Sequence, residues 1–136
     1  MPQLNPYLNF NGRCREALTF YQECLGGELT LQKISESPMA ARMPSAKGDH
    51  ILHGALEKAG TILLMGSDMI GDNLQPGNSV SLCLNCTSDQ DINTLFDRLS
   101  AGGQVKVPLH QSFWGATFAE VKDKFGMSWM LNYTRP

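Results

Sequence analysis

The feature of this sequence that most constrains its fold is an internal repeat. Residues 20–29, FYQECLGGEL, and residues 96–105, FDRLSAGGQV, share one layout without a gap: an aromatic residue on an expected helix, a Gly-Gly pair, and the start of a strand. A unit that recurs in this way is a duplicated supersecondary module, and each copy has to bury the apolar face of its sheet against another element. We therefore expect two similar modules with a cleft between them.

The spacing of apolar residues predicts the same order of elements in both modules: a strand, a helix and three further strands. Strands are predicted where apolar and polar residues alternate, and helices where apolar residues recur every three or four positions before a Gly-Gly pair. In the first module the predicted elements are a strand at 6–10, a helix at 15–25, and strands at 28–34, 51–58 and 61–67. In the second they are a strand at 79–85, a helix at 89–101, and strands at 104–109, 115–121 and 126–133.

The length of 136 residues predicts a single domain that buries its own core. Within this domain, residues 1–136, module one spans about residues 1–69, a linker rich in Gly, Asp and Pro spans about 70–78, and module two spans about 79–136. The polar stretch from Ser35 to Asp49 is too long for an ordinary connection between strands. We interpret it as a mobile loop or as a lid over a ligand.

Composition and charge exclude several classes of protein. The net charge of −2 and the scattered Lys and Arg residues give no basic stripe, so we expect no nucleic-acid partner. No segment resembles a membrane span, and residues 1–6 lack the basic start and apolar run of a signal peptide, so we expect a cytoplasmic protein with no membrane partner. The four cysteines are expected to be buried thiols, since Cys83 and Cys86 point to opposite faces of a strand and so form neither a redox pair nor a zinc site.

Motifs from both modules resemble the vicinal-oxygen-chelate superfamily, which includes glyoxalases, extradiol dioxygenases and bleomycin-resistance proteins. More narrowly, the chain looks like the PhnB-like branch of that superfamily. The motifs that carry this resemblance are PYLNFNG at 6–12, FY then LGG in 20–27, HGAL at 53–56, LMGSD at 64–68, FWG at 113–115 and DKFGMSWMLN at 123–132. The resemblance implies an α+β, glyoxalase-like fold in which two tandem βαβββ modules form a cup-shaped mixed sheet. It also implies a homodimer, in which modules pair within one chain or between two.

The resemblance does not imply one reaction, because a common fold hosts many chemistries. The older label of this branch, demethylubiquinone methyltransferase, has no support here, since the sequence lacks a Gly-rich cofactor loop between a strand and a helix. Metal-using members of the superfamily hold a divalent ion with His or Glu on the first and last strands of each module. Those positions fall here at Asn5 or Pro6, within 79–81, at Leu64 and at Met130, none of which is a good ligand. We therefore predict no metal ligand and no cofactor.

Several polar residues are expected to line the cup. On strand 51–58, Leu52 and Leu56 face the helix layer by alternation, which turns His53 and Glu57 into the cup. Glu120 is turned the same way between Ala119 and Val121. These three polar residues are compatible with a displaced metal site or a general acid–base set. The competing interpretation is a structural histidine and two solvated carboxylates.

Aromatic and amide side chains complete the candidate ligand-binding set. Tyr7, Asn9, Phe113 and Trp114 supply apolar area and hydrogen bonds of the kind that line small-molecule pockets, and Trp114 is placed to cover the cup or a dimer partner. Trp129 is expected in the core instead, because it alternates with Met127 and Leu131. The full candidate set is Tyr7, Asn9, His53, Glu57, Phe113, Trp114 and Glu120.

Three functions compete at this point. The leading hypothesis is a metal-independent protein that binds a small apolar or aromatic ligand in the cup. The second is a lyase or isomerase of the glyoxalase type, either with a displaced metal at His53 together with Glu57 or Glu120, or without a metal. The third is a dimerisation module that takes no ligand. The sequence leaves open the identity of the ligand and whether catalysis occurs.

Overall fold

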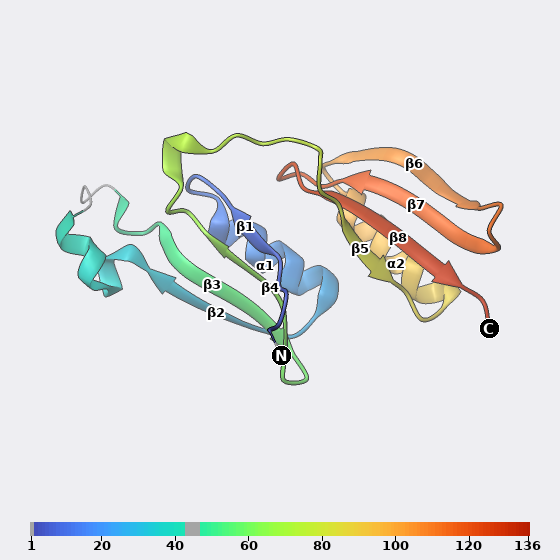
Figure 1. Ribbon diagram of the computed structural model, residues 1–136, viewed down its shortest axis with the longest axis horizontal. Helices are drawn as coiled ribbons and strands as arrows, with labels where there is room; N and C mark the ends of the chain where they lie inside the picture. The colour runs from blue at the N-terminus through green and yellow to red at the C-terminus, as the bar shows by residue number, and fades with distance from the viewer. Residues whose placement is uncertain (1, 43–46) are drawn as a thin grey trace. The chain divides into compact units, whose positions relative to one another are not determined.

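The chain folds into two compact units, Met1–Gln75 and Pro76–Pro136. The computed structural model describes residues 2–42 and 47–136, and Figure 1 labels their helices and strands. Each unit has one strand, one helix and three further strands in that order, with a four-stranded sheet. The predicted α+β fold of two tandem βαβββ modules is therefore confirmed. The cup that both modules would share, and the treatment of residues 1–136 as one domain, stay predictions.

Unit one contains a four-stranded mixed sheet in the order β1-β4-β3-β2. Its main elements are β1 (Tyr7–Asn9), α1 (Cys14–Leu25), β2 (Glu28–Lys33), β3 (Ile51–Lys58) and β4 (Thr61–Ser67). Short 3-10 helices within the described residues of this unit include η1 (Ile34–Glu36), η2 (Pro38–Arg42) and η4 (Gly71–Asn73). β1 pairs in parallel with β4, and the other neighbours are antiparallel.

Unit two repeats this topology with the strand order β5-β8-β7-β6. Its elements are β5 (Leu82–Asn85), α2 (Asp89–Ser100), β6 (Gln104–Gln111), β7 (Ala116–Lys122) and β8 (Ser128–Thr134). β5 pairs in parallel with β8, as β1 does with β4. The predicted bounds of β3 and β4 match the structure, whereas the first strand of each unit begins later than predicted, so that residues 79–81 precede β5.

In unit one, α1 packs closely on β3 and β4. A Cβ atom added to Gly54 would lie 2.6 Å from Cδ1 of Leu18, and one added to Gly66 would lie 3.3 Å from Sγ of Cys14. The residues of β3 and β4 on this side of the sheet, including Leu56 and Leu64, form the core with α1. By alternation, His53 and Glu57 lie on the other side of the sheet, which we call the helix-free face of unit one.

Unit two is built in the same way. Ala119 and Val121 of β7 and Leu131 of β8 are buried on the side of the sheet that α2 covers. Trp129 is only 2% exposed, and its indole N–H donates a hydrogen bond of 2.8 Å to Oδ2 of Asp123. The expectation that Trp129 belongs to the core is therefore confirmed. Glu120, between two buried residues, lies on the helix-free face of unit two.

The Gly-Gly pairs of the sequence repeat have the same steric role in both units. Gly26 and Gly27 have φ values of +78° and +98°, a left-handed region that other residues rarely adopt. A Cβ atom on Gly27 would lie 2.6 Å from the carbonyl oxygen of Glu57, and one on Gly103 would overlap the carbonyl oxygen of Lys122. The second glycine of each pair therefore lets the chain leave the helix directly against the end of a neighbouring strand.

Two further predictions have mixed outcomes. The stretch from Ser35 to Asp49 contains part of η1 and all of η2, but residues 43–46 lie outside the described residues, so its role as a lid stays a prediction. The expectation of buried cysteines holds for Cys14 and Cys24 and is wrong for Cys83, which is exposed on the edge strand β5.

No helix in the described ranges is long and apolar enough to cross a membrane.

Candidate functional site

On the helix-free face of unit one, Tyr7 and His53 are in direct contact. The Tyr7 hydroxyl lies 3.2 Å from Nδ1 of His53, and the two ring centroids are 5.8 Å apart. Both side chains are exposed, Tyr7 by 45%. This contact occupies Nδ1 and leaves Nε2 as the other polar atom of the imidazole ring, as a donor or an acceptor according to the tautomer.

Asn9 lies close to this pair, whereas Glu57 does not. Asn9 follows Tyr7 by two positions on β1, so both point to the same face, and it pairs with Ser67 of β4. Glu57 is four positions from His53 on β3, which separates their backbones by about 13 Å. Glu57 is exposed and lies opposite Glu28 at the end of the strand. The structure therefore brings together Tyr7, Asn9 and His53 and leaves Glu57 apart, in keeping with a solvated carboxylate.

The helix-free face of unit two carries four aromatic rings, which we call the aromatic array: His110, Phe113, Trp114 and Phe118. Their centroids are 5.0 Å apart for Phe113 and Trp114, 5.3 Å for Trp114 and Phe118, and 6.1 Å for His110 and Phe118. All three contacts are close to perpendicular, the edge-to-face arrangement that aromatic rings prefer. Phe113 is 98% exposed and Trp114 is 50% exposed, so the array presents apolar surface to solvent.

Two asparagines extend the aromatic array. The indole Nε1 of Trp114 donates to Oδ1 of Asn132 over 3.5 Å, and Nδ2 of Asn132 donates to Oδ1 of Asn85 over 3.4 Å. The candidate set from the sequence included neither of these asparagines nor His110. The available signal was alternation: Asn132 lies two positions after Met130 on β8 and therefore on the same face.

Glu120 occupies an apolar neighbourhood on the same face of unit two. It lies two positions from Phe118 on β7, and its cross-strand neighbours are Met130 on β8 and Val107 on β6. Its side chain is half-buried. The structure thus places Glu120 on the same face as the aromatic array, with Phe118 two positions before it and Lys122 two positions after it on β7.

One expected metal-ligand position requires correction. Leu64 is 2% exposed and lies in the core below α1, so it does not reach the helix-free face. Met65 does, and it pairs with Tyr7 of β1 as Met130 pairs with Cys83 of β5. The error is one residue in strand register, which moves a side chain from one face of a sheet to the other.

The side chains at and near the expected metal-ligand positions are poorly suited to bind a divalent metal. Asn5 precedes β1, and its side chain donates to the carbonyl oxygen of Ile62 over 3.3 Å. At the paired positions of the first and last strands, the side chains on the helix-free faces are amides, hydroxyls and thioethers, with one thiol at Cys83. They are Tyr7, Asn9, Met65 and Ser67 in unit one, and Cys83, Asn85, Met130 and Asn132 in unit two. Within residues 2–42 and 47–136, no three His, Cys, Asp or Glu side chains come together in a group that could hold a metal ion.

Two cysteines have strongly perturbed protonation. Burial raises the pKa of Cys14 to about 12, and the neighbouring carboxylate of Asp68 adds to the shift. Burial also raises the pKa of Cys86 to about 11, with a further contribution from Asp91. A thiol that stays protonated at neutral pH is a weak nucleophile and a weak metal ligand. Neither residue therefore offers cysteine chemistry to the candidate site.

Comparison with known proteins places this geometry in context. The sequence matches the family model described as 3-demethylubiquinone-9 3-methyltransferase over residues 2–132. Protein YjdN of Escherichia coli (strain K12) is 34% identical, over 97% of this chain and 95% of YjdN. Among solved structures, protein PA1353 from Pseudomonas aeruginosa is 35% identical with a TM-score of 0.87, over 100% of both chains. The PhnB protein from Bacillus cereus is 24% identical with a TM-score of 0.80, over 98% of this chain and 100% of that chain, and shares the fold.

Proposed function

Since the chain belongs to the PhnB-like family of the glyoxalase and bleomycin-resistance (vicinal-oxygen-chelate) superfamily, we propose that it is a small-molecule-binding protein that takes an apolar or aromatic ligand on its helix-free sheet faces. The observation that carries the proposal is the aromatic array of unit two. Its rings expose apolar surface beside the amide of Asn132. Pockets for small molecules combine such apolar area with a few polar groups that orient the ligand.

The energetics of the aromatic array favour a ligand. Full burial of one Phe side chain stabilises a complex by about 1.5–3 kcal/mol. Phe113 is 98% exposed and Trp114 is half-exposed, so a planar ligand that covers both gains apolar contact at little cost in side-chain order. The neutral amides of Asn85 and Asn132 favour a ligand with neutral polar groups over a strongly charged one.

We propose that this binding is independent of a metal ion. The proposal rests on the side chains at the superfamily's usual ligand positions, which supply too few carboxylate or imidazole groups. We do not extend the family's methyltransferase description to this chain. The connection from β1 to α1 contains one glycine, Gly12, and the connection from β5 to α2 at 86–88 contains none, whereas a nucleotide-type cofactor loop needs several.

A lyase or isomerase is the second candidate function, and the Tyr7–His53 contact is the observation that favours it. The Tyr7 hydroxyl holds the imidazole of His53 in place, as a general acid or base has to be held. A homodimer without a ligand is the third candidate, and the exposed Phe113 is compatible with it. Both alternatives predict outcomes different from those of the leading proposal.

The test is a calorimetric titration with 1-naphthol, a neutral aromatic probe, and with cyclohexanol as its aliphatic counterpart. We expect saturable binding of 1-naphthol that weakens about tenfold in Trp114→Ala, equal to about 1.4 kcal/mol. Val105→Ala is the matched control, since Val105 is 48% exposed and pairs with the core residue Val121. Absence of saturable binding for both probes would overturn the proposal.

Elemental analysis of protein purified without chelators tests metal independence separately. Because few of the side chains at the usual ligand positions bind transition metals well, we expect at most about 0.1 equivalent of any such metal per chain. Near-stoichiometric metal that His53→Ala removes would replace this proposal with the metal-dependent lyase.

A further inference from the structure

We propose that Arg135 is a positioning residue that holds the end of β6, and with it the loop that carries Phe113 and Trp114. The expected effect of Arg135 on ligand affinity rests on the proposed function. The expected effect of Arg135 on the position of the loop rests only on the structure of unit two. Sequence reasoning gave Arg135 no role.

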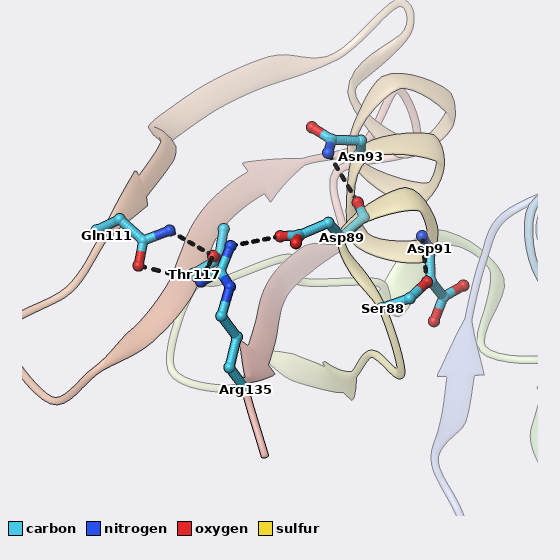
Figure 2. Close-up of polar contacts among 7 residues, drawn as sticks. All are labelled: Ser88, Asp89, Asp91, Asn93, Gln111, Thr117 and Arg135. Atoms are coloured by element: carbon cyan, nitrogen blue, oxygen red, sulfur yellow. Dashed lines mark hydrogen bonds and ion pairs between the residues drawn. The ribbon is translucent and has the colours of Figure 1, made fainter.

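Arg135 joins three elements of unit two (Figure 2). Its Nη2 atom donates to Oδ1 of Asp89, the first residue of α2, over 2.7 Å. Its Nη1 atom donates to Oε1 of Gln111 and to Oγ1 of Thr117, each over 3.2 Å. Gln111 and Thr117 are also joined directly, because Nε2 of Gln111 donates to Oγ1 of Thr117 over 2.9 Å. The guanidinium therefore ties β6, β7 and α2 to the segment that follows β8.

The same end of β6 is held from both faces of the sheet. Consecutive strand residues point to opposite faces, so His110 and Gln111 lie on different sides. His110 contacts Phe118 of the aromatic array, whereas Gln111 contacts the guanidinium. The loop at 112–115 begins one residue later and is closed by hydrogen bonds between Ser112 and Ala116. Gln111 is therefore the residue through which this closed loop is joined to the helix side of the sheet.

The geometry requires a guanidinium group. The two terminal nitrogens of Arg135 donate hydrogen bonds to acceptors on different elements. Its guanidinium carbon lies 5.7 Å from the Tyr133 ring centroid. Lysine has one ammonium group and cannot reach Asp89 and the Gln111–Thr117 pair at once. The Arg135 and Asp89 side chains are 44% and 57% exposed, and an ion pair this exposed contributes little to folding. Loss of Arg135 should therefore change the position of the loop more than the stability of the fold.

The first experiment needs no ligand. The chain contains two tryptophans, so a ¹H–¹⁵N spectrum shows two indole N–H signals, one from Trp114 on the loop and one from the buried Trp129. In Arg135→Ala we expect the Trp114 signal to move or broaden while the Trp129 signal keeps its position. Arg135→Lys should restore the Trp114 signal only in part. If both signals keep their positions in Arg135→Ala, the proposal is overturned.

Arg13→Ala is the matched control. Arg13 forms an ion pair of similar exposure with Glu16 in unit one, at 3.0 Å. We expect this variant to leave the Trp114 signal in place. If Arg135→Ala fails to fold, Asp89→Asn decides the question, because it keeps the size of the side chain and removes its charge. A shift of the Trp114 signal alone in Asp89→Asn supports the proposal, and an unchanged signal counts against it.

The second experiment measures 1-naphthol affinity. If the parent protein binds the probe, we expect Arg135→Ala to weaken binding by about three- to tenfold without a contact to the ligand, a change that Arg135→Lys reverses in part. A moved Trp114 signal with unchanged affinity would overturn the role of Arg135 in ligand binding, whereas its role in holding the loop is decided by the indole spectra. If the parent protein does not bind 1-naphthol, the proposed function fails instead, and the indole spectra alone decide whether Arg135 holds the loop.

Discussion

Unit one begins its helix with a carboxylate supplied from a distant strand, whereas unit two begins its helix with a serine beside it. Oδ1 of Asp68, which directly follows β4, accepts hydrogen bonds from the backbone N–H groups of Gly12 (2.7 Å) and Cys14 (3.1 Å). Its Oδ2 atom accepts from the N–H of Ile51 over 2.9 Å. In unit two, Oγ of Ser88 accepts from the N–H of Asp91 over 3.0 Å.

The two units therefore share a topology but use different hydrogen-bond acceptors at the start of their helices. The start of α1 depends on tertiary structure, because Arg13 at its N-cap makes no capping hydrogen bond with its side chain. The start of α2 is encoded within a few residues, as sequence patterns assume. Four predictions follow this contrast between the units, from the largest expected effect to the smallest.

Asp68→Ala should have the largest effect on stability. It leaves the buried N–H groups of Cys14 and Ile51 without their acceptor, and each such group costs about 1–3 kcal/mol, so we expect a loss of about 4 kcal/mol in the free energy of unfolding. Urea denaturation followed by circular dichroism measures it. Asp68→Asn keeps one acceptor oxygen and should lower the free energy of unfolding less than Asp68→Ala does. Equal losses in the two variants would show that the hydrogen bonds of Asp68 do not cause the loss of stability.

Glycine substitutions should show where the two units are alike. Gly27→Ala and Gly103→Ala each force a Cβ atom against a strand carbonyl oxygen, so we expect losses of about 2 kcal/mol in both units. Gly77→Ala is the control, since nothing lies within 4 Å of its added Cβ and its φ is not in the left-handed region. Thermal unfolding of the three variants checks this. A loss at Gly103 no greater than that at Gly77 would contradict the structural account of the repeat.

Ser88→Ala should cost about 1 kcal/mol, the ordinary value of an N-cap, and therefore much less than Asp68→Ala. The same urea titration measures both variants. Ser88→Asp retains a capping oxygen and should restore most of the loss. If Ser88→Ala proves as damaging as Asp68→Ala, the contrast between local and distant capping is wrong.

The smallest effect at neutral pH should come from the buried thiol of unit one. Burial raises the pKa of Cys14 from its ordinary value of 9.0 to about 12, so the folded state keeps the thiol protonated where the unfolded state ionises it. Its contribution to stability is therefore complete below pH 9 and is lost as the pH rises from 9 towards 12. Melting temperatures between pH 7 and pH 10.5 should fall more steeply in the parent protein than in Cys14→Ala. Parallel curves would contradict the prediction.

Hydrophobic periodicity was sufficient to predict the order and type of every strand and α-helix. Alternation also predicted that His53 and Glu120 face away from the helices, because that result depends only on neighbours in the chain. The ligand position that the superfamily resemblance placed at Leu64 was wrong by one residue. A shift of strand register between Leu56 and Glu57 interrupts the pairing of β3 with β4 close to this position. Such irregularities follow from three-dimensional packing and leave no signal in the pattern of apolar residues.

The candidate site was less predictable than the fold. The residues that would line it were identified by type, but the contact of Tyr7 with His53 joins positions 46 residues apart on strands that are not adjacent in the sheet. Arg135 and Asp89, also 46 positions apart, share no motif that would mark them as partners. Sequence alone supplies candidate side chains, and the sheet order decides which of them meet.

The parallel pairing of β1 with β4 has a consequence for folding during synthesis. β1 has three residues, and the carboxylate that anchors the turn after it lies 56 positions further along the chain, at Asp68. Closing so long a loop costs chain entropy before any contact offsets it, so such pairing forms late. A ribosome must therefore release nearly all of unit one before Tyr7 can reach His53. Until then the contact between Tyr7 and His53 on the helix-free face of this unit cannot form.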